Sequence, residues 1–236
     1  MGNCASTSAT AINTSAASPK TSMAPMKLYG MAMSTCCRRV SMVLEEKGLA
    51  YEIVPVDLFT GGNKTPEYLA LQPFGKIPVL VDGDVQIFES RAILRYLATV
   101  YADKGTDLVG KTVKARALTD NWLEVEANYF NDPVSKLVSE AMFKPMTGGT
   151  TDPAVVADLI VEWEKVLDVY EVQLAKHKYI AGEDFSLADI SCMPYTAYAI
   201  QAGGPGVTAA LVKHPKVKAW WALISSRPSW VKLSAA

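Results

Sequence analysis

The stretch MKLYGMAMSTCCRRVSMVL, residues 26–44, decides the fold expected for the first part of the chain. A short apolar run ending at Gly30 predicts a strand, and apolar residues at helical spacing around Val40 predict a helix after it. Ser34 stands where this helix should begin and Gly48 where it should end. A hydroxyl at a helix start is first of all a cap. The same N–H groups and the helix dipole also favour a thiolate beside it, so both roles stay open.

The residues after this helix predict a small α/β unit. Alternating residues 51–58 indicate a second strand, and a Gly-rich loop then leads to a short helix near residues 66–71. Residues 71–90 read as two strands joined by an Asp-Gly turn at Gly83. A further helix opens at Ser90. The expected order is therefore β-α-β-α-β-β-α.

The pattern becomes helical after a polar linker at residues 102–110. Residues 111–143 form one long amphipathic pattern, which Pro133 should kink or break. Cap and proline signals predict the later helices from Asp152-Pro153 towards Lys176, from Ser186-Leu-Ala-Asp189 to about Ala202, and, as the last helix, from His214-Pro215 to Arg227-Pro228. We therefore expect an all-α second domain of about five helices.

Composition and charge narrow the class of protein. Of 236 residues, 50% are apolar, and the net charge is −1 without any basic block, so nucleic acid is not an expected partner. No apolar run approaches the roughly 20 residues that span a bilayer. The four cysteines, Cys4, Cys36, Cys37 and Cys192, offer neither a disulfide framework nor metal-ligand spacing. We expect no bound metal and a reducing, cytoplasmic location.

Residues 1–22 differ from the rest of the chain. They are rich in Ser, Thr and Ala, which predicts a disordered tail. The opening MGNCAS matches an N-myristoylation pattern at Gly2, with Cys4 as a second acylation site. Membrane association is expected only if both are acylated. Alternatively, Met23 is the working start, or the tail is a processing or transit segment.

Three features of the first domain suit a peptide-like ligand with carboxylates. Ile77-Pro78 stands at a strand entrance, where a cis bond would present the preceding backbone to an extended peptide and a trans bond would be a rigid edge. Glu89 and Ser90 lie at a helix start, which favours a carboxylate. Lys64, in the Gly-rich loop, could pair with a second carboxylate of the ligand. Each residue also has an ordinary structural role, as a cap or a solvated loop residue.

Taken together, the chain resembles the phi class of cytosolic glutathione transferases from Met23 to its C-terminus. The shared blocks, in order, are MAPMKLYG, S-x-x-x-R-R-V, VDL-x-x-G-x-x-K, QPFGKIPVLVDGD, FESRAI-x-RYLA, WLEVEA, PVSKLV and FSLADI. The resemblance implies a thioredoxin-like glutathione-binding domain over residues 23–104. It also implies an all-helical domain over residues 105–236 that lines a hydrophobic acceptor pocket.

The resemblance assigns roles to single residues. Ser34 would bond the glutathione sulfur and favour its thiolate. The Ile77 backbone, before a cis-Pro78, would form main-chain bonds with the cysteinyl unit of glutathione. Glu89 and Ser90 would bind its γ-glutamyl end, and Lys64 would bind its glycyl carboxylate.

Two positions depart from the usual family pattern. Asn63 replaces a histidine before the loop lysine, which we expect to weaken glutathione binding modestly. Lys76 stands where Gln is common, and its ammonium group could still reach a carboxylate. Both remain candidate glutathione contacts.

The acceptor pocket and the adjacent cysteines are harder to assign. The candidate pocket residues that the resemblance implies are Met33, Phe59, Trp122, Phe130 and Phe143, of which Met33 and Phe130 are the preferred pair. In related folds a redox CxxC motif straddles the start of this helix. Here Ser34 takes the place of its nucleophilic cysteine, which argues against thiol–disulfide chemistry at Cys36 or Cys37.

The expected function is conjugation of glutathione, as co-substrate and without a permanently bound cofactor, to hydrophobic electrophiles. Peroxidase activity towards organic hydroperoxides would use the same Ser34. The alternative is a non-catalytic carrier of flavonoid-like molecules, since the same pocket serves both. By resemblance the protein is a homodimer in which each α/β domain faces the partner's helical domain.

Overall fold

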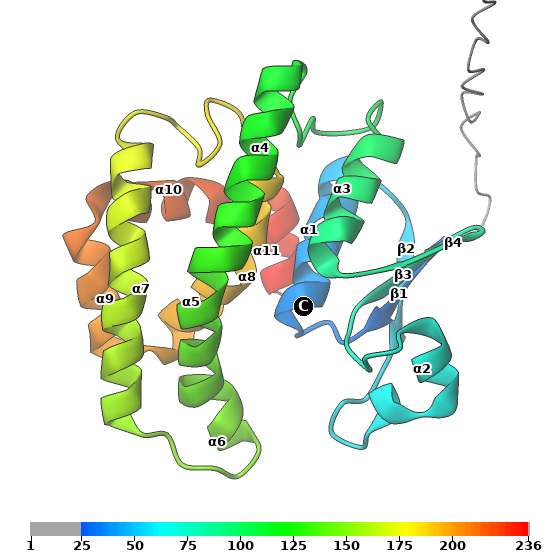
Figure 1. The fold of residues 1–236 in the computed structure, drawn as a ribbon, viewed down its shortest axis with the longest axis horizontal. Coiled ribbons are helices and arrows are strands. Elements are labelled where there is room, and N and C mark those ends of the chain that lie inside the picture. The colour runs from blue at the N-terminus through cyan, green and yellow to red at the C-terminus, as the bar shows by residue number, and fades with distance from the viewer. Residues whose placement is uncertain (1–24, 236) are drawn as a thin grey trace, which may run out of the picture.

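A computed structural model describes residues 25–235. The tail expected at residues 1–22 and the acylation sites at Gly2 and Cys4 lie outside this range. Within it, an α/β half and a helical half lie side by side (Figure 1). No helix of the described range is both long and apolar enough to cross a membrane.

The α/β half is built on a four-stranded sheet with the order β2-β1-β3-β4. The strands are β1 (Met26–Gly30), β2 (Tyr51–Pro55), β3 (Val79–Asp82) and β4 (Val85–Phe88). β1 and β2 are parallel because a helix carries the chain back between them, whereas β3 is antiparallel to both β1 and β4. Gly83, at φ 60°, forms the tight turn between β3 and β4. The expected strand at residues 51–58 ends earlier, at Pro55.

Two helices of this half face the helical half. These are α1 (Thr35–Lys47), which follows β1, and α3 (Ser90–Val100), which follows β4; they pack against each other (Figure 1). The short α2 (Pro66–Leu71) follows a single 3₁₀ turn at Gly62–Lys64. The expected order β-α-β-α-β-β-α is therefore confirmed.

The helical half begins with one long helical rod. It consists of α4 (Val113–Val125), a π-helical turn at Glu126–Phe130, α5 (Asn131–Val138), a second π-helical turn at Ser139–Phe143, and the short α6 (Lys144–Met146). Pro133 was expected to kink or break this pattern. It lies in the first turn of α5, directly after the first π turn. Proline cannot donate to the α-helical ladder, and the wider turn before it lets the helix continue.

The later helices are α7 (Pro153–Leu174), α8 (Leu187–Ala202), α9 (Gly204–Lys213), α10 (Pro215–Ser225) and α11 (Pro228–Ser234). The helix expected from His214-Pro215 does stop before Arg227-Pro228, because α10 ends at Ser225, but the expectation that it is the last helix is wrong. Pro228 instead occupies the first turn of α11, a position where its missing N–H costs nothing. α11 returns to α1, where Arg227 and Lys232 bond Glu46 and Glu45 respectively, at 2.7 and 2.8 Å.

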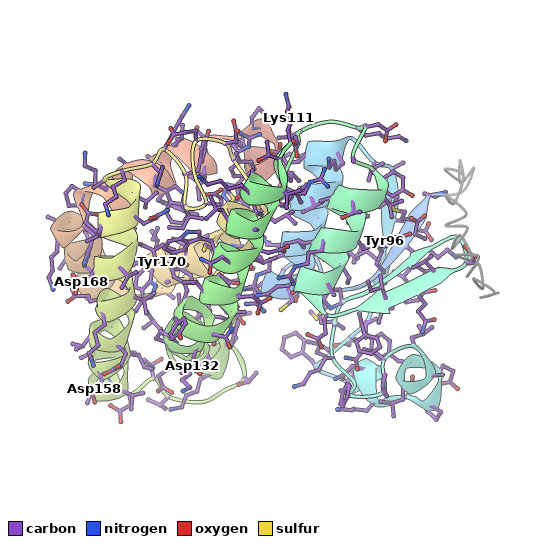
Figure 2. The ribbon with its side chains drawn as sticks, turned by 45° about the horizontal axis from the view of Figure 1, so that its top comes forward. Tyr96, Lys111, Asp132, Asp158, Asp168 and Tyr170 are labelled. Carbon is purple, nitrogen blue, oxygen red and sulfur yellow. The ribbon has the colours of Figure 1, made fainter. Side chains whose placement is uncertain are left out.

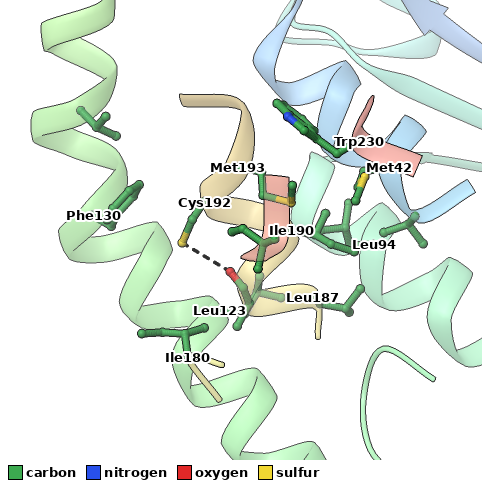
Figure 3. Packing of buried hydrophobic residues seen from close by; sticks show 14 of the residues in the cluster. Met42, Leu94, Leu123, Phe130, Ile180, Leu187, Ile190, Cys192, Met193 and Trp230 are labelled. Carbon is green, nitrogen blue, oxygen red and sulfur yellow. Dashed lines mark hydrogen bonds between the residues drawn. The ribbon is translucent and has the colours of Figure 1, made fainter. Parts of the chain in front are cut away.

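The two halves share one apolar core. Met42 of α1 and Leu94 of α3 belong to the same buried cluster as Ile190 and Met193 of α8 and Trp230 of α11 (Figure 3). Burial of this shared surface stabilises the contact between the two halves.

A buried ion pair crosses the same junction. The Arg39 guanidinium of α1 bonds the Glu126 carboxylate at 2.9 Å and the Ser191 carbonyl at 2.8 Å. Arg91 of α3 bonds the other oxygen of Glu126 at 2.6 Å. Burial alone would lower the pKa of Arg39, but the Glu126 carboxylate raises it, so the guanidinium stays charged.

We expect Glu126→Ala to destabilise the protein by about 3–5 kcal/mol, because it leaves the buried Arg39 charge without its carboxylate. Urea unfolding followed by tryptophan fluorescence measures this. The control is Asp132→Ala, which removes an exposed ion pair with Lys136 on α5 (Figure 2) and should change stability little. If Glu126→Ala lowers the free energy of unfolding no more than Asp132→Ala does, the stabilising role of the buried ion pair is contradicted.

Candidate active site

Ser34 lies at the end of the loop that joins β1 to α1. Its N–H bonds the Met31 carbonyl at 3.0 Å, and its extended backbone (φ −66°, ψ 130°) makes it the N-cap of α1. The Cys37 N–H donates to Ser34 Oγ across 3.4 Å, a long bond. The hydroxyl accepts in this bond, so its own proton remains available to donate. Both roles expected of a hydroxyl here, cap and donor to an anion, are compatible with this geometry.

An apolar pocket of about 210 Å³ opens beside Ser34 and is lined by both halves of the protein. The lining residues are Met31, Met33, Ser34, Thr35, Leu58, Phe59, Phe143, Met146 and Thr147. Met33, Phe59 and Phe143 were among the acceptor-site candidates. Met146 and Leu58 were not, because nothing in their spacing separates them from ordinary apolar residues.

The expectation that Phe130 lines the acceptor pocket is wrong. Its side chain is 0% exposed and belongs to the buried cluster (Figure 3). Its ring stacks on Tyr170 of the helical half, with a ring-centroid distance of 5.3 Å. Trp122 likewise packs edge-to-face on Tyr170. Both aromatic rings form core rather than a binding surface.

The peptide bond between Ile77 and Pro78 is cis, directly before β3. Ile77 lies beside the loop that carries Ser34, because a Cβ on Gly30 would come within 3.6 Å of the Ile77 Cβ. The same added Cβ would also collide with the Cys37 sulfur, which explains why glycine ends β1. The Ile77 backbone and the Ser34 hydroxyl therefore belong to one region.

Glu89 and Ser90 form the start of α3. Glu89 is the only residue other than glycine in the described range with a positive φ, at 69°. Its side chain makes no capping bond, and Ser90 is buried. A non-glycine residue held in this backbone region is typical of functional sites. The first N–H groups of α3 have no side-chain cap from Glu89, an arrangement that suits an anion.

The loop that carries Asn63 and Lys64 contacts the loop that precedes Ile77. Asn63 donates its amide to the Gly75 carbonyl at 2.7 Å, and the Lys64 ammonium donates to the Phe74 carbonyl at 3.3 Å. Lys76 is exposed, and its carbonyl accepts from the Tyr68 hydroxyl at 2.7 Å. Asn63 and Lys64 thus support the loop that leads to the cis bond.

Sequence reasoning missed Gln72, which organises that loop. Its buried side-chain oxygen accepts from the N–H groups of Phe74 and Lys76, at 2.7 and 3.1 Å. The only signal in the sequence is the position of Gln72 at the start of the QPFG block. A buried amide that bonds two backbone groups fixes the local conformation.

The two cysteines of α1 have different surroundings. Cys37 is fully buried, and burial raises its pKa to about 11, although a hydrogen bond between its side chain and that of Ser34 opposes this. Cys36 is half-buried, and its sulfur lies 3.7 Å from the Arg39 guanidinium. Cys37 is therefore a packing residue.

Two family models match the chain. One, described as the glutathione S-transferase N-terminal domain, matches residues 24–99. The other, described as the glutathione S-transferase C-terminal domain, matches residues 130–228.

Plant proteins are among the most similar relatives. Glutathione S-transferase 3 of Zea mays is 50% identical over 216 residues, which cover 91% of this chain and 95% of the relative. Glutathione S-transferase F10 of Arabidopsis thaliana is 48% identical over 199 residues, covering 84% and 91% respectively.

Solved structures agree in fold. Glutathione transferase F7 from Populus trichocarpa superposes with a TM-score of 0.85 at 42% identity, over 89% of this chain and 98% of that one. Glutathione S-transferase I from maize, in complex with an atrazine glutathione conjugate, superposes with a TM-score of 0.81 at 41% identity, over 90% and 97%.

We expect iodoacetamide at pH 8 to alkylate Cys36 in the folded protein and to spare Cys37. The Cys37 thiol is buried, and with a pKa of about 11 it is almost entirely protonated at this pH, whereas the thiolate is the reactive form. Fragment-ion mass spectrometry separates the two sites. Cys36→Ser should abolish the rapid labelling of the peptide that contains both positions. In urea, Cys36 and Cys37 of the unmodified protein should both react. Equal labelling of both in the folded protein would contradict the assignment.

Proposed function

The chain belongs to the glutathione S-transferase family and its phi class, and we propose that it conjugates the glutathione thiolate to hydrophobic electrophiles. The observation that carries this proposal is the Ser34 hydroxyl, which lies at a helix N-terminus and on the wall of an apolar pocket. A thiol placed there has a proton donor on one side and space for an apolar reactant on the other.

The proposed reaction uses the Ser34 hydroxyl as a donor and not as a nucleophile. Its proton points to the glutathione sulfur while its oxygen accepts from Cys37. Charge-assisted bonding and the dipole of α1 lower the thiol pKa, so the proton passes to solvent and the thiolate remains. The thiolate then attacks the electrophilic atom, a carbon–sulfur bond forms, and the leaving group departs.

The remaining parts of glutathione have plausible positions along the same surface. The Ile77 backbone before cis-Pro78 suits the cysteinyl unit, which keeps the sulfur close to Ser34. The first turn of α3 at Glu89 and Ser90 suits the γ-glutamyl end. The exposed Lys64 suits the glycyl carboxylate.

Asn63 and Lys76, the two departures from the family pattern, receive different roles. The Asn63 amide supports the Gly75 carbonyl, so we assign it to holding the loop and only indirectly to glutathione. The Lys76 side chain is exposed and is free to approach a carboxylate. Neither residue lies at the thiolate position.

The acceptor class follows from the pocket lining. Met31, Met33, Phe59, Phe143 and Met146 give it a mainly apolar wall. Thioether and aromatic side chains adapt to planar, polarisable molecules. Holding such a molecule beside the thiolate accelerates conjugation by proximity.

A homodimer is supported by large apolar side chains that the chain leaves exposed. Phe74 of the α/β half is 68% exposed, and Tyr129 and Val113 of the helical rod are 65% and 85% exposed. Exposed apolar groups on both halves suit an arrangement in which each α/β half faces the partner's helical half. The free cysteines of the described range are consistent with a reducing, cytoplasmic location.

We expect Ser34→Ala to lower the turnover of 1-chloro-2,4-dinitrobenzene with glutathione by about 100-fold, the usual effect of losing one preorganised donor. The measurement is steady-state conjugation, together with the absorbance of the bound thiolate as a function of pH. In the variant the thiolate should appear only at higher pH.

The same residue caps α1, so a second variant separates the two effects. Ser34→Gly also removes the hydroxyl but weakens a helix N-terminus less than alanine does. Both variants should lose turnover alike, while Ser34→Ala alone should lower the unfolding midpoint noticeably. Unchanged turnover in both would refute the role of Ser34. Negligible turnover in the unmodified protein, beside tight flavonoid binding that survives Ser34→Ala, would instead favour a carrier.

We expect sedimentation equilibrium to return about twice the chain mass of 25.5 kDa. Phe74→Ser should weaken this dimer at least about tenfold, because buried aromatic anchors dominate interface energies. Val169→Ser on α7 removes a comparably exposed apolar group and should leave the mass unchanged. A monomer mass for the unmodified chain would overturn the dimer.

A further inference from the structure

The loop between β1 and Ser34, residues 31–33, has open space around it. Met31 and Met33 line the acceptor pocket, and both also line a second cavity of about 640 Å³. This cavity extends to Tyr51 and to Leu233 of α11. A backbone segment with cavities around it has few packing partners, so hydrogen bonds must fix its position.

All three carbonyl groups of this loop accept a hydrogen bond. The Met31 carbonyl accepts from the Ser34 N–H at 3.0 Å, and the Ala32 carbonyl accepts from Arg38 Nε at 3.2 Å. Both donors follow closely in the chain. The third carbonyl, that of Met33, accepts from the Tyr198 hydroxyl at 2.6 Å, and Tyr198 belongs to α8 of the helical half.

We propose that Tyr198 is a positioning residue that fixes the wall of the acceptor pocket and, through it, the Ser34 hydroxyl. This inference rests on the conjugation activity proposed above. Met33 directly precedes Ser34, so a restraint on the Met33 carbonyl restrains the peptide unit that carries the Ser34 N–H. One hydroxyl from the helical half therefore links the acceptor wall to the peptide unit that carries the thiolate donor.

The Tyr198 ring is itself held firmly. It is 5% exposed, packs edge-to-face on Phe143 with 5.9 Å between ring centroids, and lies under the Arg38 guanidinium at 5.2 Å. Phe143 lines the acceptor pocket, and Arg38 bonds the same loop. The ring thus connects the opposite wall of the pocket with the loop.

The protonation state of Tyr198 suits a permanent donor. Burial raises the pKa of this phenol, and the Arg38 charge opposes the shift only in part. The phenol therefore keeps its proton in the pH range where a glutathione thiolate forms. Without the hydroxyl, the Met33 carbonyl has to find water or move.

The test is Tyr198→Phe, which keeps the ring and its contacts with Phe143 and Arg38 and removes only the hydroxyl. We expect kcat/KM for the acceptor to fall about tenfold, since a small displacement of reacting groups costs one to two orders of magnitude. KM for glutathione should change less than twofold, because Ile77, Glu89 and Lys64 are untouched. Hydrogen exchange at the backbone amides of residues 31–34 should become several-fold faster.

Tyr170→Phe is the matched control. Tyr170 is a buried tyrosine of α7 (Figure 2). Among the described residues its hydroxyl has one hydrogen-bond partner, the Cys192 thiol of the helical half, at 3.7 Å. This variant should leave kcat/KM and the exchange of residues 31–34 as in the unmodified protein. Unfolding midpoints for both variants show whether each is folded at the assay temperature.

Two results would overturn the inference. The first is that Tyr198→Phe and Tyr170→Phe have the same kcat/KM for the acceptor and the same hydrogen exchange at residues 31–34. The other is faster exchange throughout α1 and α8 with no excess at residues 31–34, which would make Tyr198 a general stabilising residue. The exchange measurement needs no turnover. An unmodified protein without conjugating activity would therefore refute the proposed function separately, while exchange still decides whether Tyr198 holds the loop.

Discussion

The arrangement of this protein depends on the buried ion pair between Arg39 and Glu126. A guanidinium and a carboxylate removed from water are costly unless each finds full compensation. Here Glu126 accepts from Arg39, Arg91 and the Ser191 hydroxyl, and Arg39 also reaches the Ser191 carbonyl. These partners come together only when α1, α3, the long rod and α8 are all in place. The pair therefore specifies one docking of the two halves, which apolar burial alone would leave less defined.

This constraint acts on the same helix that carries the reaction. Ser34 caps α1, and Arg39 follows within the next two turns. At the C-terminal end of α1, Glu45 and Glu46 form ion pairs with the α11 segment. Directly before α1, the Met33 carbonyl accepts a hydrogen bond from Tyr198 of α8. α1 is thus bonded to the helical half at its beginning, middle and end. The proposed thiolate site at its N-terminus and the proposed acceptor wall on the helical rod consequently keep a fixed separation, which proximity catalysis requires.

Local signals made the α/β half predictable, whereas the helical half depends on contacts between distant residues. The strand period before Gly30, the Asp-Gly turn at Gly83 and the cap at Ser34 each act within a few residues. Pro228, by contrast, looked like a stop signal and begins α11, because proline suits a first helical turn as well as the position after a last one. The helix after Pro228 is instead stabilised by ion pairs with α1 and by burial of Trp230, and these contacts join residues far apart in the sequence.

The acceptor pocket shows the same limit more sharply. Phe130 and Phe143 lie on one helical rod, and on an ideal α-helix residues 13 positions apart differ in direction by about 220°. One of them must then face the core if the other faces the pocket, but the sequence does not say which. The two π turns make the phase harder still to follow, since each wider turn shifts the residues after it around the axis. Phe130 closes the first π turn and meets Tyr170, whereas Phe143 closes the second and meets Tyr198 at the pocket. Periodicity alone therefore could not assign Phe143 to the pocket wall that it shares with Ser34.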